Sequence, residues 1–172
     1  MAFQIILVME TKESSKSDYM YISSVLDQWY DFRARNDIKL SEVYMGGKGN
    51  YKCSKVVKRI EKLTNSYNNG ETHVIYFFDT DRYENNINDS RVLREEQEYC
   101  TTNNYEFVWF CHDIEEVFLG RTVAKNEKTD EAIAYARRRG INRLKKESFK
   151  AEKMGKKRSN LILVLDKYFG VR

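Results

Sequence analysis

Four short apolar runs alternate with segments of helical periodicity, and this order limits the possible folds more than any other feature of the chain. The apolar runs have the length of strands and cover residues 3–9, 38–45, 72–79 and 105–111. Between them, apolar residues recur every three or four positions in 19–32, in 51–67 and from about residue 88 to 100. Strands that alternate with helices predict an α/β fold, in which helices flank a mostly parallel, four-stranded sheet.

The last part of the chain differs from the rest in charge. Residues 1–120 carry 14 Lys and Arg against 20 Asp and Glu, whereas residues 121–172 carry 16 against 6. Helical patterns are predicted for a short turn at 112–120, for a very basic stretch at 128–154 interrupted by Gly140, and for 159–170. We therefore expect one domain, with an α/β core over 1–120 and a basic helical extension over 121–172 packed on it. An acidic body joined to a basic segment suits an anionic partner.

Short polar residues mark where the helices are expected to begin. Asp, Asn and Ser side chains accept hydrogen bonds from the free N–H groups of the first helical turn. The candidate caps are Ser17 or Asp18 for the first helix, Asn88, Asp89 or Ser90 for the third, and Ser159 or Asn160 for the last.

Composition excludes several classes of protein. The N-terminal apolar run is short and has no basic segment before it, and no apolar stretch approaches the length that spans a bilayer. Cys53, Cys100 and Cys111 are odd in number and widely spaced, which predicts free thiols in a reducing cytoplasm. No membrane partner is expected, because no apolar stretch is long enough to span a bilayer. Two His residues, with no CxxC or HxxxH spacing, argue against a zinc site built from soft ligands.

Acidic residues follow three of the four predicted strands. Glu10 ends the first, Asp79 and Asp81 end the third, and Asp113 and Glu115 follow the fourth. Functional groups of open parallel sheets gather at the carboxyl ends of the strands, so we expect these carboxylates to converge. Carboxylates packed together repel one another, and a divalent cation removes that conflict. Oxygen ligands without His or Cys favour Mg²⁺ or Mn²⁺. A DxD pair that only caps a turn is the alternative.

The same residues resemble the Toprim domain of topoisomerases, primases and related nucleases. IILVME with Glu10, followed by VIYFFDTD with Asp79 and Asp81, matches an N-terminal strand ending in Glu and a later strand ending in DxD. HDIEEVFL is similar to the D-[LI]-E motif of Toprim nucleases of the overcoming-lysogenisation-defect class. The layout also resembles small standalone Toprim-like proteins of the RloB type, which occur in bacterial defence loci. The resemblance covers about residues 3–120 and implies a Toprim-like, Rossmann-like fold.

What the resemblance implies about function is specific to residues. It implies that Glu10 is a general acid or base or a metal ligand, that Asp79 and Asp81 hold Mg²⁺, and that Asp113 and Glu115 serve a second metal. It also implies a lysine that contacts the scissile phosphate, for which the candidates are Lys150 and Lys153. Many Toprim sequences carry Gly directly after the Glu, where this chain has Thr11.

Basic residues predict where a nucleic acid would bind. The segment ARRRGINRLKK is dense enough in charge to contact a phosphate backbone, through Arg137, Arg138, Arg139, Arg143, Lys145 and Lys146. The loop GGKGN (46–50) lacks the P-loop pattern and is interpreted as an ordinary turn, although Lys48 could reach a substrate.

Three functions compete on this evidence. The favoured one is a Mg²⁺-dependent nuclease that acts on DNA or RNA, with a role in phage defence or on a mobile element, and a regulatory protein partner, suggested by the resemblance alone. The second is a non-catalytic module that binds nucleic acid or protein. The third is a phosphotransferase or phosphatase of the haloacid-dehalogenase kind, in which a DxD motif supplies the nucleophile. Its motif usually lies on the first strand, and here it lies on the third.

Overall fold

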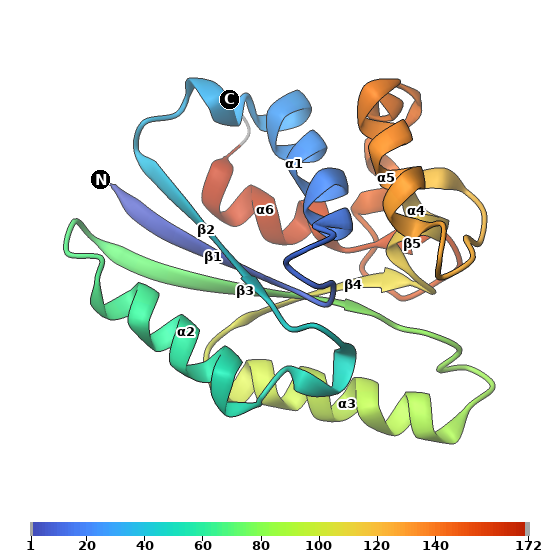
Figure 1. The fold of residues 1–172 in the computed structure, drawn as a ribbon, viewed down its shortest axis with the longest axis horizontal. Coiled ribbons are helices and arrows are strands. Elements are labelled where there is room, and N and C mark those ends of the chain that lie inside the picture. The colour runs from blue at the N-terminus through green and yellow to red at the C-terminus, as the bar shows by residue number, and fades with distance from the viewer. Residues whose placement is uncertain (1, 171–172) are drawn as a thin grey trace.

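Five strands form one sheet in the computed structural model, which describes residues 2–170 (Figure 1). Four of them are parallel and lie in the order β2-β1-β3-β4, with bounds β1 (Phe3–Met9), β2 (Ile38–Tyr44), β3 (Glu71–Asp79) and β4 (Glu106–Cys111). The fifth, β5 (Arg158–Ser159), runs antiparallel to β4 and adds a strand to the four that the sequence predicts. It was missed because its two residues carry no periodic pattern.

Helices cover both faces of the sheet, as the uninterrupted apolar strands require. One face carries α2 (Ser54–Asn65) and α3 (Ile87–Thr102). The other carries α1 (Ser17–Tyr30), α4 (Ile114–Leu119), α5 (Lys128–Arg137) and α6 (Leu161–Phe169) (Figure 1). Short 3₁₀ turns at Phe32–Ala34, Lys48–Asn50, Gly140–Arg143 and Lys146–Phe149 connect these elements.

Strand β3 shows how the two cores are filled from one sequence. Ile75 and Phe77 point into the core under α1 and α4–α6, whereas Tyr76 and Phe78 point into the core above α2 and α3. Each of these side chains is at most 2% exposed, and burial of one such side chain contributes about 1.5–3 kcal/mol. Residues beyond Gly120, such as Phe149, belong to the first of these cores, so the basic segment and the α/β part share one interior.

Two helix starts differ from the predicted caps. The cap of α3 is Asn86, whose side chain accepts from the N–H groups of Asn88 and Asp89. The predicted caps Asn88, Asp89 and Ser90 all lie inside the helix. Helix α1 begins at Ser17, so Asp18 lies inside its first turn. The preceding residue, Lys16, adopts the left-handed conformation (φ 52°), and its side chain makes no capping bond.

The helical pattern predicted for 128–154, interrupted by Gly140, is confirmed before the interruption and wrong after it, where only the 3₁₀ turns Gly140–Arg143 and Lys146–Phe149 form. Helix α5 ends at Arg137, and Arg139 takes the left-handed conformation (φ 50°), which turns the chain back. Gly140 packs directly on the ring of Tyr135, where a Cβ atom would lie 2.3 Å from Cδ2. The tertiary packing of Tyr135 therefore overrides the helical propensity of the run, and the arginines do not share one helical stripe.

Residues 2–170 contain neither a membrane-spanning helix nor a disulfide. In that part of the chain, no helix has the length and apolar character needed to cross a bilayer. Cys53, Cys100 and Cys111 are free thiols.

Candidate functional site

Glu10 and Asp79 meet at the carboxyl edge of the sheet because their strands, β1 and β3, are neighbours. The backbone N–H of Asp79 donates to Oε1 of Glu10 (2.8 Å). Oδ1 of Asp79 in turn accepts from the backbone N–H of Ile114 (2.9 Å), at the start of α4. These bonds hold one oxygen of each carboxylate and tie the ends of three elements together. The convergence expected from the sequence is therefore present for these two residues.

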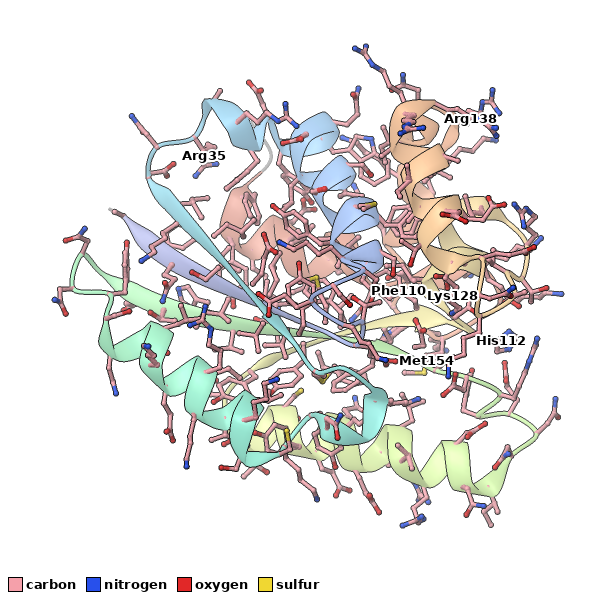
Figure 2. All side chains as sticks on the ribbon, viewed as in Figure 1. Arg35, Phe110, His112, Lys128, Arg138 and Met154 are labelled. Carbon is pink, nitrogen blue, oxygen red and sulfur yellow. The ribbon has the colours of Figure 1, made fainter. Side chains whose placement is uncertain are left out.

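Asp113 and Glu115 have different roles at the start of α4. Asp113 is its N-cap, and Oδ1 accepts from the N–H of Glu116 (2.8 Å). Glu115 is 1% exposed and pairs with Nζ of Lys128 (2.8 Å), which also lies 3.7 Å from Oδ2 of Asp113. Figure 2 shows Lys128 at the end of the sheet where β3 and β4 finish. Glu115 thus joins the buried acidic group, and Asp113 lies at its margin.

Asp18 also belongs to this group, although its position in the sequence predicts only a helix cap. It is 8% exposed, and burial, together with the charge of Glu115, raises its pKa to about 7. Hydrogen bonds from the backbone of Thr11 and Glu10 oppose that rise. An acidic residue in the first helical turn after a strand that ends in Glu was the available signal.

Electrostatic strain is concentrated on Glu10 and Asp79. Burial raises the pKa of Glu10 well above its usual value, and Lys48 and the Asp79 N–H only partly offset this. Burial likewise raises the pKa of Asp79, and the neighbouring charges of Glu10, Asp18 and Glu115 raise it further. Among residues 2–170, no Lys, Arg or His forms an ion pair within 4.0 Å of Glu10, Asp18 or Asp79. In their ionised form, these carboxylates therefore carry more negative charge than the cations of the site neutralise.

Lys48 closes the other side of the site. It follows β2, and its Nζ donates to the carbonyl of Asp79 (2.6 Å) and to Oδ2 of Asp81 (2.9 Å). The loop that carries it is held by Gly46 N–H and Gly47 N–H, which donate to the carbonyls of Thr11 and Glu10. Asp81 is half exposed and lies at the rim rather than inside. The loop of residues 46–50 thus positions Lys48 beside the DxD motif. The amides of Gly46 and Gly47 are already hydrogen-bonded within the chain.

Glu96 of α3 is a second acidic residue that the sequence did not single out. It is fully buried, and neither carboxylate oxygen has a hydrogen-bond partner within the described chain. Its nearest cation is Lys48, with Nζ 4.0 Å from Oε2. Burial raises the pKa of Glu96 to about 8, although Lys48 lowers it. Burial lowers the pKa of Lys48, and Glu96 and Asp81 more than offset that effect.

The donor set fits a hard divalent cation that takes few protein ligands. One oxygen of Glu10 and one of Asp79 are held by backbone N–H groups. No three of the carboxylates in this part of the chain offer oxygens that all lie within 4.8 Å of one another. Mg²⁺ commonly binds through one or two carboxylates and keeps several waters, so two carboxylates suffice for it.

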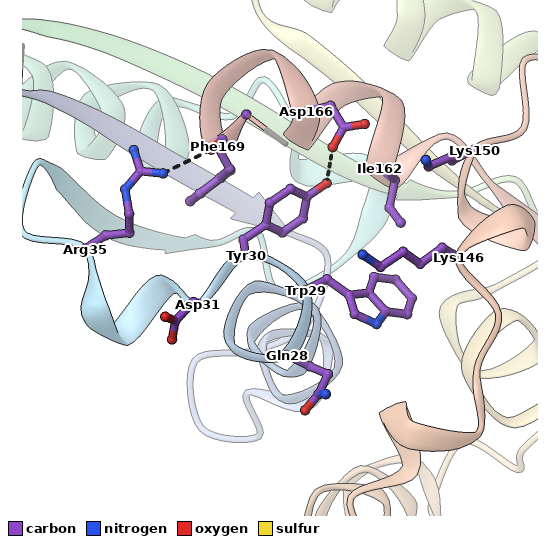
Figure 3. A pocket seen from close by; sticks show the side chains of 11 residues that line it. Gln28, Trp29, Tyr30, Asp31, Arg35, Lys146, Lys150, Ile162, Asp166 and Phe169 are labelled. Atoms are coloured by element: carbon purple, nitrogen blue, oxygen red, sulfur yellow. Dashed lines mark hydrogen bonds between the residues drawn. The ribbon is translucent and has the colours of Figure 1, made fainter. Parts of the chain in front are cut away.

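The structure does not bring Lys150 or Lys153 to these carboxylates. Lys150 and Lys146 line a pocket of about 330 Å³ between α1 and α6, together with Trp29 and Asp166 (Figure 3). Lys146 lies over the ring of Trp29, with Nζ 5.7 Å from the ring centroid. Lys153 lies in a shallow depression beside β5. The lysines that lie beside the carboxylates are Lys48 and Lys128, and not the predicted Lys150 or Lys153.

The other basic residues are distributed over several surfaces. Arg138 and Arg143 line a groove of about 470 Å³ that borders α4 and also contains Arg121 and Lys157. Arg139 lines a separate depression with Arg33, and Arg137 and Lys145 are exposed. Figure 2 shows Arg138 at the far end of α5 from Lys128. Of the six predicted nucleic-acid-binding residues in this segment, Arg138 and Arg143 are therefore the two that line a groove reaching α4, the helix that carries Glu115.

Comparison of the chain with family models, with curated proteins and with solved structures found no match. The fold class and the site geometry therefore stand on the residues of this chain alone.

Proposed function

We propose that the protein is a metal-dependent nuclease that hydrolyses phosphodiester bonds of DNA or RNA at the carboxyl edge of a Toprim-like sheet. One observation carries the proposal. The N–H of Asp79 donates to Glu10, Oδ1 of Asp79 accepts from the first residue of α4, the helix that carries Glu115, and the pKa values of all three carboxylates are raised, chiefly by burial. A cation is the direct means of stabilising such a group in its charged form. The resemblance to Toprim motifs, on Glu10, Asp79 and Asp81, supports the same conclusion.

Mg²⁺, or Mn²⁺ in its place, would be held by Glu10 and Asp79, with Asp81 at the rim and Asp113 and Glu115 on the neighbouring helix. When bound, such an ion polarises a phosphate oxygen and neutralises the charge that develops on it. Lys48 pairs with Asp81 and Lys128 pairs with Glu115, so a second ion would bind after these ion pairs break.

The chain's own groups would contribute binding and proton transfer. A glutamate whose pKa is raised is a stronger base than an exposed one, which suits a general base that takes a proton from an attacking water. Lys48 and Lys128 flank the carboxylates and would attract the phosphate. The groove with Arg138 and Arg143 would hold the adjoining backbone through charge. A defence role and a regulatory partner rest on the resemblance alone.

Cleavage assays with a panel of substrates test this proposal. Single-stranded DNA, duplex DNA, total tRNA and structured RNA are incubated with Mg²⁺, Mn²⁺ or EDTA. We expect metal-dependent products, and a loss of at least about 100-fold in Glu10→Gln and Asp79→Asn, since each removes a charge at the reacting centre. Asp27→Asn is the matched control, because Asp27 lies on α1 and its carboxylate pairs with the exposed Arg33. Full activity in both site variants would refute the assignment.

A second candidate, the non-catalytic binding module, is favoured by a specific feature. Asp81 and Glu115 are paired with Lys48 and Lys128 at 2.9 and 2.8 Å, so part of the acidic edge is already neutralised by the chain itself. Under this alternative the pairs are structural. Calorimetric titration with Mg²⁺ separates the two, because a structural edge would bind the ion no better than Glu10→Gln does.

A further inference from the structure

Three side chains of unlike chemistry meet beside the acidic edge. They are the carboxylate of Glu84, the thiol of Cys111 and the imidazole of His112, and one ligand atom of each lies within 4.8 Å of the other two. Within residues 2–170 no other group of His, Cys, Asp and Glu satisfies this criterion. Glu84 comes from the loop between β3 and α3, and the other two come from the end of β4. Figure 2 shows His112 at this end of the sheet.

Both ring nitrogens of His112 face carboxylates. Its Nε2 faces Oε1 of Glu84 (2.8 Å), and its Nδ1 faces Oε2 of Glu116 (3.0 Å). Glu116 is buried and also accepts from the backbone N–H of His112 (3.2 Å). Ligating imidazoles usually donate their second ring N–H to a carboxylate, which fixes the tautomer and the ring. A guanidinium only donates, so Nδ1 can accept from Arg82 in the metal-free protein while Nε2–H donates to Glu84. Metal binding at Nε2 requires the other tautomer, in which Nδ1–H donates to Glu116.

The charges around the cluster also suit a divalent ion. Arg82 lies 3.1 Å from Nδ1 of His112 and 3.5 Å from Oε1 of Glu116, so it shares Glu116 with the imidazole. Zn²⁺ bound by a thiolate, a carboxylate and a neutral imidazole has no net charge. Only Glu84 is exposed to solvent, which gives an ion and its water a route of entry.

Cys111 places its sulfur in the interior, at the end of β4. Burial raises the pKa of its thiol, and hydrogen bonds from the Thr80 side chain and the Gly155 backbone offset part of that rise. Lys157 N–H donates to the carbonyl of Cys111 (2.7 Å) and holds the strand end in place.

We propose that Glu84, Cys111 and His112 form a binding site for one Zn²⁺ ion, with Glu116 orienting the imidazole and the fourth coordination position open to water. Nitrogen, sulfur and oxygen ligands of this kind select zinc over Mg²⁺, which the purely acidic edge would bind. The ion would fasten the loop of Glu84, which also carries Asp81, to the end of β4. The spacing argument against zinc fails here because the tertiary fold brings the ligands together from two segments.

Cobalt substitution tests the proposal on the metal-stripped full chain. Titration with Co²⁺ is expected to give a thiolate-to-metal charge-transfer band at one equivalent, and Zn²⁺ is expected to abolish it by competition. Cys111→Ser and His112→Gln should lose the band, and Cys53→Ser should keep it. Glu10→Gln should also keep it, which separates this site from the proposed nuclease site, on which the zinc proposal does not depend.

Glu116→Gln covers the case in which a ligand variant fails to fold. It leaves all three ligands in place and should weaken Zn²⁺ binding by about 10–100-fold, the usual effect of losing a carboxylate behind a ligating imidazole. Far-ultraviolet circular dichroism confirms that each variant is folded. The absence of the band in the wild type, its persistence in Cys111→Ser, or unchanged affinity in Glu116→Gln would overturn the proposal.

Discussion

Replacing Glu96 by glutamine should stabilise the protein at alkaline pH and change it little near pH 5. The folded-state pKa of Glu96 is about 8, against 4.5 for an ordinary glutamate, because burial disfavours its charged form. Folding therefore takes up a proton between these two values, and wild-type stability falls as the pH rises from about 4.5 to about 8. At about 1.36 kcal/mol per pH unit, the loss reaches about 3 kcal/mol at pH 7 and about 5 kcal/mol above pH 8.

Urea denaturation of both proteins at pH 5, 7 and 9, in EDTA, measures this effect. The quantity of interest is the change with pH of the difference in unfolding free energy between Glu96→Gln and the wild type. Any constant difference between a buried amide and a neutral acid cancels in that comparison. Glu95→Gln, which removes an exposed partner of Arg91 on the same helix, is the control and should stay within about 0.5 kcal/mol. A difference that does not vary with pH, or an equal effect in the control, would refute the assignment of a buried, protonated Glu96.

Three further changes have defined outcomes. Gly140→Ala should lower the unfolding free energy by about 1–3 kcal/mol in urea, because its Cβ would meet the ring of Tyr135, whereas Gly49→Ala, with open space around it, should have a much smaller effect. Asn86→Ala removes the cap of α3 and should lower the thermal midpoint through a loss of about 1 kcal/mol; an unchanged midpoint would mean that the cap is dispensable. Lys48→Met should reduce metal-dependent cleavage by at least about 10-fold with secondary structure intact, and undiminished cleavage would exclude Lys48 from phosphate binding.

The strands and their order along the chain were predictable from the sequence. All four predicted strands match the observed ones to within one residue at each end, because runs such as VIYFF are apolar on both faces whatever surrounds them. The meeting of Glu10 and Asp79 was predictable as well, since parallel strands present their carboxyl ends at one edge. Both inferences need only local pattern and the geometry of a parallel sheet.

The helix caps and the basic segment were less predictable. The choice of Asn86 over its polar neighbours depends on which side chain reaches the first turn, and several adjacent residues offer the same chemistry. Gly140 marks the interruption in the sequence, but the way the chain turns back there, without resuming an α-helix, depends on the packing of Gly140 against Tyr135. Helical propensity in a charged run was outweighed by burial of one aromatic ring.

The α/β architecture, the parallel core and the acidic edge follow from hydrophobic periodicity and from where the strands end, so local pattern is enough to infer them. The residues that complete the edge are set by tertiary packing. Lys48, Lys128, Asp18 and Glu96 reach it from different elements, and the Glu84–Cys111–His112 cluster is assembled in the same way. Contacts between residues far apart in the chain depend on the docking of whole elements, and no short segment encodes that docking.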